Sequence, residues 1–148
     1  MTDYAAAATL IAGFEGFAPR AKWDVNAFRL GYGSDTSGAA QTPVKEGDTT
    51  DRADALANLE ARIPKFEAVI VQQIGMTAWQ DWNDAPQVQS ALLSVCYNYG
   101  HLPSHVADCA KSGDTMALAD AVIALQADNA WVNEKRRVAE ANLIASAA

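Results

Sequence analysis

The sequence contains few of the residues that mark a disulfide-rich, metal-binding or nucleic-acid-binding protein. Only two of its 148 residues are cysteines, which is too few for a disulfide framework. Lys and Arg number 11 against 18 Asp and Glu, so the net charge is −7 and no concentrated basic face is available for nucleic acid. His101 and His105 have helical spacing, but no acidic cluster accompanies them, so we expect no metal site.

Long apolar runs are missing as well. Residues 1–5 include no basic side chain, and the apolar stretch that follows is interrupted at Glu15, so we expect neither a signal peptide nor a membrane anchor. Cys96 lies in an apolar run and is interpreted as a small buried hydrophobe in a chain made in a reducing cytoplasm. With half its residues hydrophobic and a fifth charged, the chain is expected to form one domain over residues 1–148.

Helical periodicity dominates what is present. A first helix is predicted over residues 3–14, a strand over 28–33, and an exposed loop over 34–50. A long helix begins near residue 51 and has the clearest apolar stripe, at Leu56, Leu59, Ile63, Phe66 and Ile70. Pro64 falls within this stripe and predicts a kink or a fresh start.

The second half of the sequence predicts further helices. Residues 79–86, with two tryptophans, are interpreted as a loop or short turn, followed by a helix from Pro86 to Gly100. Another helix begins at Asp114 or Thr115, and the last covers about 133–145. The pattern predicts an α+β fold that is mainly α, with a small N-terminal β-hairpin.

Two carboxylates lie nine residues apart around the predicted hairpin. Glu15 closes the first helix between Phe14 and Phe17, and Asp24 lies at a turn. Acid-catalysed glycoside cleavage needs one protonated and one ionised carboxyl group. Apolar neighbours favour the protonated form at Glu15, whereas the wetter turn favours ionised Asp24. Taken singly, each residue also fits a plain helix-end or turn carboxylate.

The ordered set of motifs resembles the phage-type lysozymes, the endolysin family of glycoside hydrolases. The resemblance rests on Glu15-Gly16, on Asp24, on Gly31-Tyr32-Gly33, and on two later segments, 91–100 and 136–143, that are similar to the family's core and terminal helices. It implies a lysozyme-like fold with a helical C-terminal lobe and no cofactor. The implied activity is that of an N-acetylmuramidase, which cleaves the β-1,4 bond between N-acetylmuramic acid and N-acetylglucosamine in bacterial peptidoglycan.

The resemblance also implies roles for individual residues. Glu15 is the general acid, and Asp24 holds or activates a water or stabilises the charge that develops on the sugar. The family's Thr before the Gly-aromatic-Gly turn is replaced by Arg29 in the matching register, or by Leu30 when counted strictly from Asp24, and neither has a hydroxyl. Thr36 is the catalytic candidate to supply the missing hydroxyl, with Ser34 as the alternative source. The other alternative is that Asp35 joins the site. Arg29 is predicted either to bind a muramic or peptide carboxylate or to be an exposed strand residue.

Further side chains are candidates for binding substrate. Trp23 offers a flat face for a sugar ring, although most tryptophans belong to the core. Asn98 is predicted either to contact an N-acetyl group or to cap a helix. Tyr32 and Ser34, around the glycine turn, complete the predicted substrate-binding set.

Arg136 and Arg137, in the last predicted helix, can be interpreted as structural or as functional residues. The family counterpart of that helix packs near the active-site Glu, where a cation would favour an ionised carboxylate. We favour a structural role, in which Arg136 and Arg137 neutralise a helix surface with Glu134 and Glu140.

Two other functions stay open on the sequence. In a lytic transglycosylase the muramic 6-hydroxyl attacks in place of water, so the missing Thr is dispensable. The other alternative is a non-catalytic peptidoglycan-binding or virion structural module. We expect a monomer that accumulates in the host cytoplasm and reaches the wall through a separate pore protein, or else a virion-associated domain.

Overall fold

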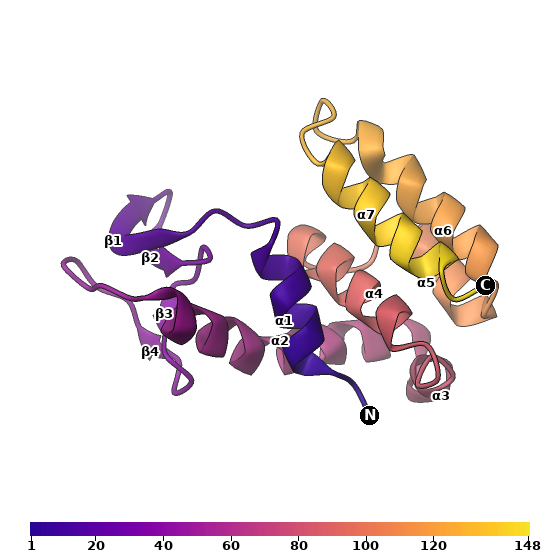
Figure 1. Cartoon of the computed structure of the whole chain (residues 1–148), viewed down its shortest axis with the longest axis horizontal. Helices are drawn as coiled ribbons and strands as arrows, with labels where there is room; N and C mark the ends of the chain where they lie inside the picture. Colours follow the sequence, from indigo (N-terminus) through magenta and orange to yellow (C-terminus); the bar gives the residue numbers. More distant parts are fainter. The chain divides into compact units, whose positions relative to one another are not determined.

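The computed structural model describes residues 1–148, which form two compact units. One, here called the hairpin unit, is Tyr4–Pro64. The other, here called the helical unit, comprises Met1–Asp3 and Lys65–Ala148. Figure 1 labels their elements along the chain.

The hairpin unit begins with helix α1 (Tyr4–Ala12) and an antiparallel hairpin of β1 (Ala18–Asp24) and β2 (Ala27–Gly31). In this hairpin Trp23 lies opposite Phe28, and Asp24 lies opposite Ala27. A second hairpin, of β3 (Thr36–Ser37) and β4 (Thr42–Pro43), occupies the segment that the sequence predicted as a loop. That prediction was wrong in part, because such short strands leave no periodic signal.

A two-residue turn joins β1 to β2 and carries an unusual conformation. Val25 has φ 53°, in the left-handed region, and the N–H of Asn26 donates to the carbonyl of Asp24 at 2.6 Å. Asn or Gly normally occupies such a position, because a β-branched side chain crowds the backbone there. The turn therefore keeps a local strain of roughly 1–3 kcal/mol.

Helix α2 (Arg52–Ile74) is continuous through Pro64, and the division between the two units falls at that proline. The expected fresh start at Pro64 is therefore wrong. The Pro64 side chain is exposed, and the buried Leu59, Ile63 and Ile70 lie in the predicted apolar stripe.

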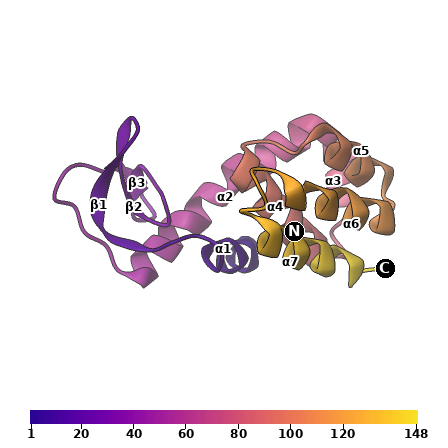
Figure 2. The same ribbon diagram turned by 90° about the horizontal axis from the view of Figure 1, so that it is seen from above.

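The helical unit contains α3 (Met76–Gln80), α4 (Pro86–Tyr99), α5 (Ser104–Ser112), α6 (Thr115–Ile123), a 3-10 turn η1 (Ala124–Ala127) and α7 (Glu134–Ala145). Nine consecutive residues of α4, Val88–Cys96, are buried, so α4 is its central helix. Helix α7 packs against both α4 and α6, as Figures 1 and 2 show. No helix is both long and apolar enough to cross a membrane.

Helix ends follow the predicted chemistry in this unit. Gly100 ends α4 at φ 83°, and the carboxylate of Asp114 caps α6 by accepting from the N–H of Ala117 at 3.0 Å. Two helices differ from the prediction. Helix α3 places Trp79 in the core rather than in a loop, and α5 begins directly after Pro103, in a segment for which no helix was predicted.

Candidate active site

Glu15 lies three residues beyond the end of α1, in the turn that follows Ala12, so the helix ends earlier than predicted. The N–H of Glu15 donates to the carbonyl of Ile11 at 3.1 Å, so this turn stays attached to the helix, and the Glu15 side chain is half-buried. Phe17 follows, with its ring centroid 5.6 Å from that of Tyr32 and the guanidinium of Arg52 lying 4.5 Å from the Phe17 ring centroid. An apolar, partly covered segment thus adjoins the carboxyl in sequence, which is a suitable setting for a general acid.

Asp24 forms an ion pair with Arg29, which lies on the neighbouring strand. The Nε atom of Arg29 lies 3.3 Å from Oδ2 of Asp24, and the two side chains are 34% and 61% exposed. The other guanidinium nitrogens of Arg29 donate to the carbonyl of Gly33 at 3.4 Å and to Oδ1 of Asn26 at 3.5 Å. Arg29 therefore spans the end of the hairpin and holds Asp24 from the neighbouring strand.

The strand register separates Trp23 from Asp24. Directly opposed residues of an antiparallel pair share a face, and adjacent residues of one strand point to opposite faces. Trp23 lies opposite Phe28, with ring centroids 5.2 Å apart, so both are on the face away from Asp24 and Arg29. Trp23 is 63% exposed and available to a ligand, but only on that other face.

The predicted hydroxyl residues form a polar cluster. The Oγ atoms of Ser34 and Thr36 lie 3.1 Å apart, and the amide of Asn58 donates to Thr36 at 3.0 Å and to the carbonyl of Gly38 at 3.1 Å. Ser34, Asn58 and Tyr32 are all buried. A small hollow adjoins the cluster, lined in part by Leu30, Thr36 and Asn58. Asn58 was missed from the sequence, since a polar residue beside a helix stripe gives no signal of its own.

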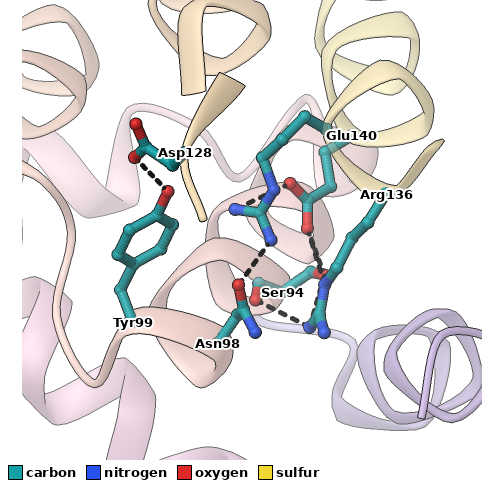
Figure 3. A network of polar contacts seen from close by, with 7 residues as sticks. Ser94, Asn98, Tyr99, Asp128, Arg136 and Glu140 are labelled. Carbon is teal, nitrogen blue, oxygen red and sulfur yellow. Dashed lines mark hydrogen bonds and ion pairs between the residues drawn. The ribbon is translucent and has the colours of Figure 1, made fainter. Parts of the chain in front are cut away.

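Asn98 lies in the helical unit, exposed near the end of α4, where its side-chain oxygen accepts from Nη2 of Arg137 at 3.0 Å. Figure 3 shows this contact beside Glu140, which is fully buried. Oε1 of Glu140 accepts from the Ser94 hydroxyl at 2.6 Å and from Nε of Arg136 at 3.1 Å. Oε2 lies 3.3 Å from Nη1 of Arg137.

This network corrects the expected surface neutralisation. Arg136, Arg137 and Glu140 are buried together, whereas Glu134 is exposed. Burial raises the pKa of Glu140, and the positive charges of Arg137 and Arg136 oppose that rise. The arginines thus have the structural role that was favoured, but inside the unit instead of on its surface.

Tyr99, at the end of α4, adds a second contact drawn in Figure 3. Its hydroxyl donates to Oδ2 of Asp128 at 2.6 Å, and the Arg137 guanidinium lies 5.3 Å from its ring centroid. Burial, followed by the contact with Asp128, raises the pKa of Tyr99 to about 12. No group of three or more His, Cys, Asp or Glu side chains is arranged to hold a metal ion.

Comparison with known proteins identifies a sequence family and similar folds. The sequence model of the phage lysozyme family matches residues 12–142, which include Glu15 and Asp24. The fold is similar to an endolysin from Escherichia coli O157:H7 phage FAHEc1, with a TM-score of 0.72, 22% identity, and coverage of 97% of this chain and 92% of that one. It is also similar to the muramidase domain of SpmX from Asticaccaulis excentricus, with a TM-score of 0.70, 20% identity and 94% of each chain covered.

No match was found among curated protein sequences. The two structural likenesses are below 25% identity and establish the fold, whereas the family match spans most of the chain. The chain therefore belongs to the phage lysozyme family and is a lysozyme-type glycosidase that acts on peptidoglycan.

Proposed function

We propose that the protein is an N-acetylmuramidase that hydrolyses the β-1,4 bond between N-acetylmuramic acid and N-acetylglucosamine, with Glu15 as general acid. The observation that carries the proposal is the position of Glu15, which is half-buried in the turn directly after α1 and lies inside the matched segment 12–142. The muramidase and endolysin of similar fold support the substrate class.

In this reaction Glu15 donates its proton to the glycosidic oxygen as the bond to the anomeric carbon breaks. Positive charge develops on the sugar ring, and ionised Asp24 stabilises it or activates the attacking water. The Asp24 side chain is 61% exposed, so its carboxylate is accessible to a sugar and to water, as this role needs.

The remaining site residues are proposed on their positions in the two units. Thr36 is the third catalytic candidate, with its hydroxyl oxygen positioned by Asn58 and Ser34. Arg29 binds a substrate carboxylate, and Trp23, Tyr32, Ser34 and Asn98 bind the glycan. The uninterrupted helix α2 and the family match across both units support one catalytic domain over residues 1–148.

We also propose that the protein acts as a monomer. Its proposed route is accumulation in the host cytoplasm and release to the wall through a separate pore protein. Entry as a virion component is the alternative.

The test is mass spectrometry of the products from purified peptidoglycan, with Glu15→Gln beside the wild type. Reducing muramic ends are expected from the wild type, and the variant should be slower by about 10²–10⁴-fold because it has no proton to donate. Glu46→Gln, which alters an exposed carboxylate of the same unit, is the matched control and should keep full activity.

Two results contradict the proposal. Anhydromuramic ends identify a transglycosylase. Wall binding without products, from the wild type as well as the variant, identifies a binding module.

A further inference from the structure

We propose that Arg29 exchanges partners when substrate binds, so that a carboxylate of the peptidoglycan takes the guanidinium from Asp24 and releases that residue for catalysis. This inference rests on the proposed function and deepens it. Arg29, which stands where the resemblance predicted a threonine, is the group that selects the substrate.

The ion pair between Arg29 and Asp24 is weak enough to be exchanged. Its 3.3 Å contact is formed by two partly exposed side chains, and the other two contacts of Arg29 are 3.4 and 3.5 Å long, near the limit for hydrogen bonds. Exposed pairs of this kind contribute little to stability, because water screens both charges. A substrate carboxylate that approaches the guanidinium therefore meets little resistance.

The pair is also unfavourable for the proposed reaction. A guanidinium beside Asp24 cancels much of the negative charge that must face the positively charged sugar. Arg29 offers only hydrogen-bond donors, so it cannot accept a hydrogen bond from the attacking water as a hydroxyl group can. The arrangement without substrate is thus a resting one, and substrate binding has to change it.

The substrate supplies the group that makes the change. Peptidoglycan bears carboxylates on its stem peptides, and a muramic acid without a stem peptide bears a free lactyl carboxylate. The planar fork of Arg29 matches a carboxylate through two parallel hydrogen bonds, which is stronger than its present single contact with Asp24. Lys22 lies directly opposite Arg29 in the hairpin and adds a second positive charge on that face.

Three substrates separate the possible sources of the carboxylate. Intact glycan with stem peptides presents peptide carboxylates, amidase-stripped glycan presents lactyl carboxylates, and chito-oligosaccharides present none. We expect the wild type to show kcat/KM at least about tenfold higher on one or both charged substrates than on chito-oligosaccharides. Whichever charged substrate is preferred identifies the carboxylate.

Variants of Arg29 then test the exchange. Arg29→Ala should lose the preference, through a higher KM on the charged substrate, while its kcat on chito-oligosaccharides should rise above that of the wild type because Asp24 is no longer paired. Arg29→Lys should keep part of the preference. Arg20→Ala, which removes an exposed arginine from β1, is the control and should keep all of it.

A merely structural role gives a different result. If Arg29→Ala lowers kcat/KM on all three substrates by the same factor, the exchange is wrong and the proposed function stands. If the wild type cleaves none of them, or Glu15→Gln stays active, the proposed function itself fails. Circular dichroism confirms that each variant is folded before its rates are compared.

Discussion

At the scale of single side chains, Glu140 is the carboxylate that pairs with two buried arginines of the helical unit. Its carboxylate contacts Arg136 and Arg137, all three are buried, and Ser94 supplies a neutral donor. Because two guanidiniums lie beside one carboxylate, positive charge is already in excess there. Removing the negative charge of Glu140 is therefore costly.

We therefore expect Glu140→Gln to lower the free energy of unfolding by about 3–5 kcal/mol, because it leaves two guanidiniums uncompensated inside the unit. Glu134→Gln, an exposed change on the same helix, should cost at most about 1 kcal/mol. Urea unfolding of both variants measures the difference. Equal midpoints would show that the buried carboxylate contributes little.

The sequence was sufficient to place single residues along the chain, but it did not show which side chains meet. Glu15 just beyond the first helix and Asp24 at the hairpin turn follow from local pattern. The pairing of Arg29 with Asp24 depends on strand register and side-chain reach, which no local pattern encodes. The same register places Trp23 on the opposite face, although it precedes Asp24 directly.

At the scale of elements, helix caps were the most reliable signals. Asp114 and Gly100 mark helix ends as their chemistry requires. Pro64 was misleading because a proline on the exposed side of a long, packed helix is tolerated when buried residues on the other side hold the helix together. The short α3 and α5 lacked enough residues for a clear period.

The junction of β2 with α2 gives a matched pair of substitutions. Gly31 has φ +62°, and a Cβ atom there would lie 2.9 Å from Cβ of Ala55, whereas Gly33 has φ +78° with nothing within 4 Å. Gly33→Ala should cost about 1–2 kcal/mol from backbone strain alone. Gly31→Ala should cost roughly 1–3 kcal/mol more, from overpacking.

Urea unfolding at equal protein concentration measures both glycine variants. Equal losses of stability would mean that β2 moves away from Ala55 without cost. A larger loss for Gly31→Ala identifies close contact between strand and helix as a requirement of the hairpin unit.

At the scale of the whole molecule, the net charge of the protein is negative, whereas the β1–β2 hairpin carries local positive charge. The net charge is −7, while Lys22 and Arg29 place positive charge on one face of the β1–β2 hairpin. Bacterial walls are themselves anionic, so the overall field opposes approach and only the hairpin favours it.

This opposition predicts an unusual response to salt. The Debye length falls from about 30 Å at 0.01 M to about 8 Å at 0.15 M ionic strength. Over that range we expect kcat/KM on intact peptidoglycan to rise as repulsion is screened, and kcat/KM on uncharged chito-oligosaccharides to stay constant. Turbidity and product assays in a salt series provide the measurement, and a fall on peptidoglycan would show that the hairpin charges dominate the encounter.

The two buried cysteines make the folded protein a convenient background for site-specific labelling. Burial raises the pKa of Cys96 to about 12 and raises the pKa of Cys109 as well, and only the thiolate reacts rapidly with alkylating reagents. Val25→Cys would place one accessible thiol at the hairpin tip, where the native side chain is 89% exposed. A fluorophore attached there would report glycan engagement in real time, with both native thiols left in place.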